Sequence, residues 1–145
     1  MLNKFKLDNC KSVPTPLIPN TKLSKPEEDE KVDGSIYRSL VGSLLYLTAT
    51  RLDLMFAASL LSRYMQTPGE VHMGVARCVL RYIKGTKGYG IWYTKEKESE
   101  VKILHCPTNE QLVDIFTKPL PRRKFCVLRA ALGVSSKNLK EENVD

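Results

Sequence analysis

Carboxylate side chains are the first candidates for chemistry in this 145-residue chain. Hydrolysis of a phosphodiester by two divalent cations needs several Asp or Glu side chains that converge on one point. The acids here lie in a linker run (27–30), a charged turn (96–100), helix caps and the C-terminal tail, with Asp114 near the start of an expected helix. None belongs to an expected strand that would set it beside Asp114, and the chain has no Tyr-x-Asp-Asp sequence. We therefore predict no catalytic residue and no metal ligand set.

Basic side chains gather in two clusters and indicate a different activity, the binding of phosphate groups. Arg77, Arg81 and Lys84 recur at i, i+4 and i+7, so a helix would carry them on one face, with Lys87 just beyond. The second cluster consists of Lys118, Arg122, Arg123 and Lys124. Two interpretations stay open: a weak, sequence-independent surface for a nucleic-acid backbone, or a solvated helix face.

The overall charge agrees with a polyanionic partner, because the net charge is +7 and the pI is near 9.3. Residues 1–34 hold six basic and six acidic side chains, residues 35–100 nine and five, and residues 101–145 eight and five. The excess therefore falls on the segments that carry the two clusters.

The compartment is predicted from the cysteines and the apolar runs. The four cysteines form no Cys-x-x-Cys pair and no disulfide-like spacing, and no signal peptide is visible. The longest nearly apolar run, 40–47, is too short to span a bilayer. We therefore expect reduced thiols in an intracellular protein, cytoplasmic or nuclear, without membrane contact.

Three short amphipathic helices are expected between residues 36 and 86, because apolar side chains recur there at helical spacing. The expected inward positions are Ile36, Leu40, Leu44 and Leu47; then Leu54, Ala57, Ala58, Leu61, Tyr64 and Met65; then Val71, Val75, Cys78, Val79 and Tyr82.

Capping residues set the expected ends of these helices. Thr50 stands three residues before Asp53, and Thr67 stands three residues before Glu70, which is the spacing of capping boxes. Gly85 is placed to end the third helix.

The C-terminal part is expected to add a short β-hairpin and two helices. Residues 91–94 and 101–106 alternate like strands across a charged turn. One helix is expected to start at Thr108 as its cap, and another spans 122–132. The fold class is therefore α+β, mainly helical: three helices, a short hairpin and two C-terminal helices.

Four sequence blocks carry a family resemblance. They are YRSLVGSLLYLTATR (37–51), DLMFAASLLSRYM (53–65), VLRYIKGTKGYGI (79–91) and HCPTNEQLVDIFTKPLP (105–121). The first three resemble the region that connects reverse transcriptase to ribonuclease H in the Pol polyprotein of copia-type LTR retrotransposons. The fourth resembles the very end of that ribonuclease H domain. The resemblance covers roughly residues 2–134.

The resemblance also implies what is missing. Family ribonucleases H bind Mg²⁺ through three acidic positions in the body of the domain and one near its end. That body would lie between Thr94 and Val101, where this chain has a six-residue turn. Asp114 matches the terminal acidic element and is a possible relic of a metal ligand. The resemblance therefore implies an internally deleted, catalytically inactive Pol remnant without a cofactor, lacking the polymerase palm and most of ribonuclease H.

The expected organisation follows from the same blocks. Residues 1–34 form an extended strap and charged linker, 35–94 the connector helices and first strand, 95–134 the ribonuclease H remnant, and 135–145 a disordered tail.

Because so little sheet remains, we expect Phe125 to be poorly covered.

Two alternatives to an inactive remnant stay open. One is a basic module that binds RNA–DNA hybrid or duplex DNA weakly and without sequence preference. The other is an enzyme fragment complemented in trans by an intact Pol. The oligomeric state is not predicted.

Overall fold

The structure of the protein is a computed structural model, and it describes residues 2–5, 7, 9–24, 32–91 and 106–136. Five α-helices and two short strands form in these residues, so the mainly helical α+β class is confirmed. The helices are α1 (Gly34–Leu47), α2 (Met55–Ser62), α3 (Glu70–Gly85), α4 (Asp114–Thr117) and α5 (Arg122–Ala131), and the strands are β1 (Tyr89–Ile91) and β2 (Val134–Ser136). Within the described part, no helix is long and apolar enough to cross a membrane.

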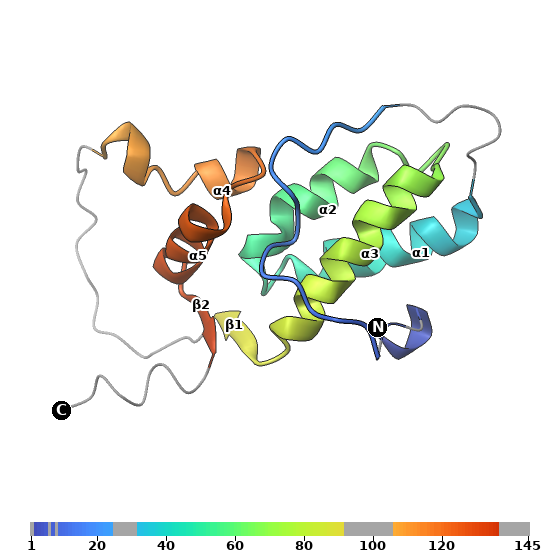
Figure 1. The fold of residues 1–145 in the computed structure, drawn as a ribbon, viewed down its shortest axis with the longest axis horizontal. Helices are drawn as coiled ribbons and strands as arrows, with labels where there is room; N and C mark the ends of the chain where they lie inside the picture. The colour runs from blue at the N-terminus through green and yellow to red at the C-terminus, as the bar shows by residue number, and fades with distance from the viewer. Residues whose placement is uncertain (1, 6, 8, 25–31, 92–105, 137–145) are drawn as a thin grey trace.

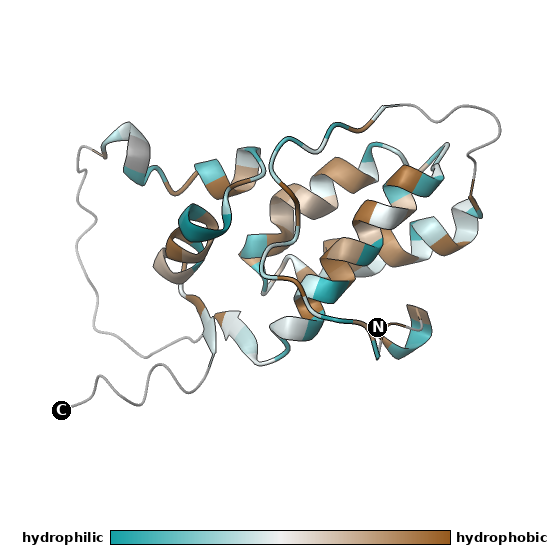
Figure 2. Ribbon diagram, viewed as in Figure 1, coloured by the Kyte–Doolittle hydropathy of each residue, from teal (hydrophilic) through white to brown (hydrophobic). Residues whose placement is uncertain are grey.

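Helices α1, α2 and α3 pack against one another, and α4 and α5 lie at the end of this group, where α4 contacts α2 (Figure 1). The apolar stretches of the helices turn toward one another, as the brown segments in Figure 2 show. One continuous core results, and it includes Leu17 from the N-terminal segment as well as Ile115 and Phe125 from α4 and α5.

The first helix is rotated relative to the expected stripe. Leu40 and Leu44 are buried as predicted, but Ile36 is 50% exposed and its place in the core is taken by Tyr37. The Tyr37 hydroxyl donates a hydrogen bond to the Leu61 carbonyl oxygen at 2.9 Å. This bond to α2 fixes the rotation of α1, and apolar spacing alone does not reveal it.

The third helix is rotated in the same way. Val79 and Tyr82 are buried as predicted, whereas Val71 is 53% exposed. His72 and Met73 fill the core instead.

Both predicted capping boxes are wrong, because His72 binds the backbone at the start of α3 and, among the described residues, no side-chain bond caps the start of α2 or the 3₁₀ turn before it. Helix α3 begins after Gly69, whose N–H donates to Nδ1 of His72 at 2.9 Å. The Thr50 hydroxyl donates to the Leu47 carbonyl at 3.4 Å, and Asp53 is buried with a different partner. The predicted end of the third helix at Gly85 is confirmed.

The sheet differs from the predicted hairpin. Strand β1 pairs antiparallel with β2, with Tyr89 opposite Ser136 and Ile91 opposite Val134. Gly133, at φ 78°, turns the chain from α5 into β2, and this left-handed conformation favours glycine. Of the predicted hairpin, residues 92–105 lie outside the described residues. Ser135 and Ser136, which were assigned to a disordered tail, belong to β2 instead, and residues 137–145 are not described.

The helix predicted to start at Thr108 is also divided. A single 3₁₀ turn covers Thr108–Glu110, and the α-helical part is the four residues of α4. The interruption falls at Gln111, whose side-chain amide donates to the Cys106 carbonyl at 3.1 Å instead of reaching back to the cap.

The N-terminal strap, residues 9–24, is part of the folded unit. It runs across the face made by α2 and α3 (Figure 1). Nε of Arg81 donates to the Lys11 carbonyl at 2.7 Å, and the Tyr64 hydroxyl donates to the Leu23 carbonyl at 2.8 Å. At Gly85 the strap lies close against α3, because a Cβ there would lie 2.9 Å from Cβ of Ser12.

This close approach predicts opposite effects for two alanine substitutions in α3. Gly74 is exposed and a Cβ there meets nothing within 4 Å, so Gly74→Ala should stabilise the protein by about 0.5–1 kcal/mol through helix propensity. Gly85→Ala should destabilise it by about 1 kcal/mol or more, since the strap must shift. Chemical denaturation of each variant measures the difference.

The cause is checked in a Ser12→Gly background, where the cost of Gly85→Ala should shrink. Equal stabilisation by both alanines would mean that the strap does not lie against Gly85.

Candidate functional site

Asp114, the possible relic of a metal ligand, is the first residue of α4 and is bound by two lysines. Nζ of Lys118 lies 2.8 Å from Oδ1, and Nζ of Lys124 lies 2.5 Å from Oδ2. The hydrogen bonds from Lys118 and then Lys124 lower the pKa of Asp114 below its ordinary value. The carboxylate is therefore charged, but ammonium groups occupy the positions that a cation would need.

The described residues do not fit a magnesium site. Two Mg²⁺ ions need several carboxylates that converge, so that their mutual repulsion is offset. Within the described part of the chain, no three or more His, Cys, Asp or Glu side chains gather where they could hold a metal ion. Asp114 alone, with both oxygens on lysines, cannot supply such a set.

The C-terminal basic cluster is divided by these contacts. Lys118 and Lys124 are engaged with Asp114, whereas Arg122 and Arg123 are exposed at the start of α5. The structure therefore brings all four residues to one corner of the molecule, and two of their charges have no acidic partner within the described part of the chain.

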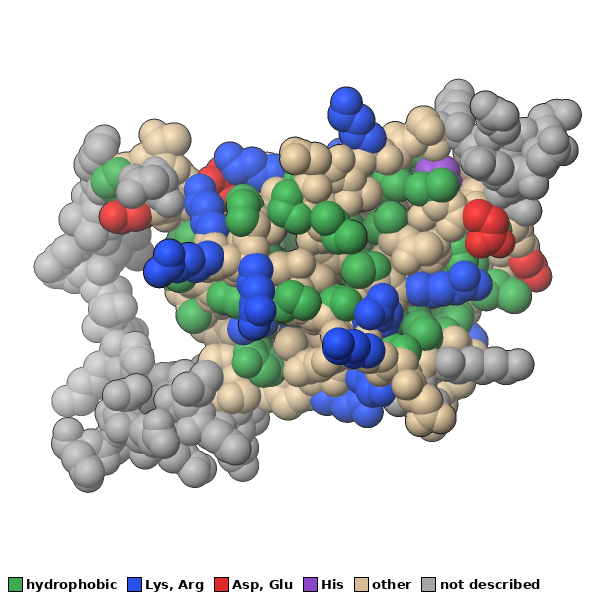
Figure 3. Space-filling model, viewed as in Figure 1, with side chains coloured by type: hydrophobic (Ala, Val, Ile, Leu, Met, Phe, Trp, Pro, Cys, Tyr) green, Lys and Arg blue, Asp and Glu red, His purple; other side chains and the backbone are tan. Residues whose placement is uncertain are grey.

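The cluster on α3 is divided in another way. Arg77 is exposed on the helix, and Lys87 is exposed just beyond it, as the spacing predicts. Nε of Arg81 binds the Lys11 carbonyl at 2.7 Å, and Nζ of Lys84 binds the Cys10 carbonyl at 2.6 Å, so these two side chains hold the strap. Because a carbonyl carries no net charge, the bond to the strap does not neutralise the charge of Arg81. Figure 3 shows Lys and Arg side chains distributed across this face, with acidic side chains mainly near its two ends.

A buried ion pair that was not predicted lies beneath this surface. Nε and Nη2 of Arg51 donate to the two carboxylate oxygens of Asp53 at 2.9 and 2.8 Å. The two residues are 6% and 2% exposed. Arg51 also donates to the carbonyl and hydroxyl oxygens of Thr86, at 3.0 and 2.9 Å. The pair therefore joins the start of α2 to the end of α3.

The same network reaches α5 through Tyr82. The Tyr82 hydroxyl donates to Oδ2 of Asp53 at 2.5 Å and accepts from Nη1 of Arg129 at 3.0 Å. The Tyr82 ring meets the Phe125 ring edge to face, with 5.6 Å between centroids. The Arg129 guanidinium lies over the Tyr89 ring, 4.4 Å from its centroid. Three segments of the chain thus meet at one buried hydroxyl: the start of α2, the end of α3, and α5.

Burial and charge set the protonation of this network. Burial opposes the charge on Arg51, but the hydrogen bond and charge of Asp53 outweigh it and raise the pKa of Arg51. Burial, together with the negative charge of Asp53, raises the pKa of the Tyr82 hydroxyl well above its ordinary value. Arg51 therefore keeps its charge and Tyr82 stays neutral, which suits a structural role.

The signal for this network was partly present in the sequence. Asp53 was singled out as the capping partner of Thr50, although it pairs with Arg51 two residues away. Thr86 and Tyr82 lie about 30 residues further along, and no local pattern connects them to Asp53. The hint that the sequence offered was the position of Asp53, a charged residue at the start of the apolar stripe of the second helix.

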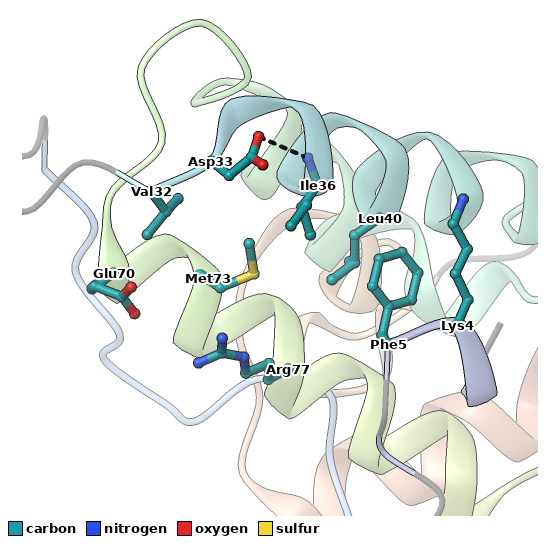
Figure 4. Close-up of a pocket in the computed structure, with 9 residues that line it drawn as sticks. All are labelled: Lys4, Phe5, Val32, Asp33, Ile36, Leu40, Glu70, Met73 and Arg77. Carbon is teal, nitrogen blue, oxygen red and sulfur yellow. Dashed lines mark hydrogen bonds between the residues drawn. The ribbon is translucent and has the colours of Figure 1, made fainter.

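A cleft of about 560 Å³ lies between α1, α3 and the N-terminal 3₁₀ turn Asn3–Phe5. Its lining mixes apolar side chains with two acids and two bases (Figure 4). Asp33 is committed to the first turn of α1, since its Oδ1 accepts from Ser35 N at 2.8 Å and from Ile36 N at 3.4 Å. The remaining lining charges, on Lys4, Glu70 and Arg77, form no ion pair recorded among the described residues, and we assign no chemistry to this cleft.

Similar proteins identify the family. The chain is 38% identical over 95 residues to the retrovirus-related Pol polyprotein from transposon RE1 of Arabidopsis thaliana. The matched region covers 66% of this chain and 6% of that polyprotein. It is also 38% identical over 95 residues to the retrovirus-related Pol polyprotein from transposon TNT 1-94 of Nicotiana tabacum. That match covers 61% of this chain and 7% of the polyprotein. An uncharacterized mitochondrial protein of Arabidopsis thaliana is 30% identical over 107 residues, which are 70% of this chain and 96% of that protein.

The chain therefore belongs to the family of copia-type retrotransposon Pol polyproteins, and the resemblance of the sequence blocks is confirmed. It spans 6–7% of the length of these two Pol polyproteins and so corresponds to a small part of them. No protein-family model matches the chain, and no solved structure matches it.

Loss of the buried pair should be costly. Asp53→Asn leaves Arg51 buried without its counter-charge, and we expect the free energy of unfolding to fall by about 3–5 kcal/mol. Tyr82→Phe removes a single hydroxyl and should cost about 1–3 kcal/mol. Urea denaturation followed by far-ultraviolet circular dichroism measures both.

Glu110→Gln is the matched control, because this acid is exposed and its loss should change stability by about 0.5 kcal/mol or less. If Asp53→Asn costs no more than Glu110→Gln, the pair does not hold these segments together.

Proposed function

We propose that this chain has no catalytic activity of its own and is an inactive remnant of a copia-type Pol polyprotein. The observation that supports this proposal is the state of Asp114. It matches the terminal acidic element of ribonuclease H, yet Lys118 and Lys124 bind its two oxygens at 2.8 and 2.5 Å.

The count of ligands leads to the same proposal. Cleavage of RNA in a hybrid by two metal ions requires an activated water and a stabilised leaving oxygen, both on metals held by converging carboxylates. Among the described residues, Asp53 is buried in an ion pair and Asp33 caps α1. Neither acid is free to join Asp114.

The purified chain should therefore leave RNA in an RNA–DNA hybrid intact. The assay is a labelled hybrid incubated with the protein and either Mg²⁺ or Mn²⁺, resolved on a denaturing gel. Mn²⁺ tolerates looser geometry and should not restore cleavage.

Asp114→Asn separates the possible origins of any cleavage. Metal-dependent cleavage that Asp114→Asn abolishes would overturn the proposal and restore an enzyme. Cleavage that Asp114→Asn does not change would come from a contaminant.

A second candidate function is weak, sequence-independent binding of duplex DNA or RNA–DNA hybrid. The observation that favours it is the bonding of the α3 cations. Arg81 binds a carbonyl oxygen of the strap, which carries no net charge, so this bond does not neutralise its positive charge. Arg77 on α3 and Lys87 just beyond its end add two exposed charges.

Salt dependence tests this binding. If Arg77, Arg81 and Lys84 each neutralise one phosphate, log K against log salt should fall with a slope of about −2.7. Affinity should then drop roughly 40-fold between about 50 and 200 mM salt, with no sequence preference. Filter binding on duplexes of two unrelated sequences measures both quantities.

Binding that survives at high salt, or that discriminates between the sequences, would contradict this picture. Absence of binding at low salt would leave a solvated basic face.

A further inference from the structure

A second pocket, of about 380 Å³, lies where three distant parts of the chain meet, and we call it the strap–α5 pocket. The strap contributes Ser12, the end of α3 contributes Gly85 and Thr86, and α5 contributes Arg122 and Arg129. Neither Asp114 nor the two lysines bound to it line this pocket. The pocket also shares no lining residue with the cleft between α1 and α3.

The described lining of the strap–α5 pocket carries two cations and no acid. Arg122, Cys126 and Arg129 recur at i, i+4 and i+7, so one face of α5 lines the pocket. No ion pair to Arg122 or Arg129 is recorded among the described residues, in contrast to Lys118 and Lys124 nearby. The charge of the pocket is therefore not offset by its lining.

Arg129 is held in place with much of its hydrogen-bonding capacity unused. Its Nη1 donates to the Tyr82 hydroxyl at 3.0 Å, and its guanidinium lies over the Tyr89 ring. Its Nε–H is buried and has no partner among the described residues. An unsatisfied buried donor costs stability, and the described residues supply no acceptor for this one.

The chemistry of the lining favours a phosphate group as the ligand of the pocket. Guanidinium forks bind phosphate oxygens bidentately, and an arginine already fixed by packing loses little freedom when it does so. The Ser12 hydroxyl adds a neutral donor at the same pocket. Arg122 is also the first residue of α5, a ten-residue helix whose start has no side-chain cap, and such a start favours negative charge.

We propose that the strap–α5 pocket is an anion site that takes one phosphate group, of the kind that a nucleic-acid backbone presents. This inference rests on the second proposed function and gives it a fixed anchor. Lys84 and Arg81, at the end of α3, bind the carbonyls of Cys10 and Lys11, just before Ser12 in the strap. A backbone anchored in the pocket would therefore continue over the cations of α3.

Two neighbouring arginines provide a matched pair of variants. Arg122 lines the pocket, whereas Arg123 does not, and both are exposed residues of the first turn of α5. Arg122→Gln and Arg123→Gln therefore remove the same charge from almost the same place. Both should fold, and thermal denaturation checks that they do.

The first measurement is a titration of the ¹⁵N-labelled protein with inorganic phosphate, with chloride at matched ionic strength as the reference. Saturable shifts are expected at the amides of residues 12, 85–89 and 122–129, and not with chloride. Arg122→Gln should weaken this binding about tenfold, which is the loss of one charge-assisted hydrogen bond, and Arg123→Gln much less. Equal weakening by both, or shifts that do not saturate at these residues, would overturn the site.

The second measurement is binding of a short duplex to the same two variants at one low salt concentration. A larger loss for Arg122→Gln than for Arg123→Gln supports the pocket as a backbone anchor. Duplex binding with equal losses overturns the pocket and leaves the second proposed function standing. Phosphate binding in the pocket without any duplex binding supports the anion site and overturns that function.

Discussion

The buried pair of Arg51 and Asp53 is the interaction on which the rest of this small fold depends. Removing two charges from water is expensive, and their attraction repays this cost only when the remaining donors and acceptors are also satisfied. Thr86 supplies two acceptors to Arg51, and Tyr82 supplies a donor to Asp53. The pair is therefore stable only while α3 ends at the observed place, which also positions the strap and β1.

Through Tyr82 the same network determines where the C-terminal segment docks. Phe125 was expected to be poorly covered, because so little sheet remains, but it is 4% exposed. Its ring packs edge to face on Tyr82, while Arg129 bonds the Tyr82 hydroxyl. The connector helices take over the covering role that a sheet was expected to play, and β2 adds a strand opposite β1.

Helical periodicity predicted which segments become helices, because each of them buries one side against its neighbours. It did not predict their rotation, since Ile36 and Tyr37 are both apolar and the choice depends on the bond from Tyr37 to Leu61. Spacing placed Arg77, Arg81 and Lys84 on α3 but could not tell that two of them would bind the strap. Asp114 stood out by its resemblance, whereas Lys124 reaches it from ten residues away and no local pattern shows this.

Because Tyr82 bonds Asp53 and Arg129 and packs on Phe125, we expect α5 and the helices α1 to α3 to unfold as one cooperative unit. Native-state hydrogen exchange at increasing denaturant concentration tests this expectation, because it reports the opening free energy of each helix separately. The slowest amides of α5 and of α3 should exchange through the same global opening, with the same free energy and denaturant dependence. A single cooperative unit is ruled out if the amides of α5 all exchange through a separate opening of much lower free energy while those of α3 stay protected.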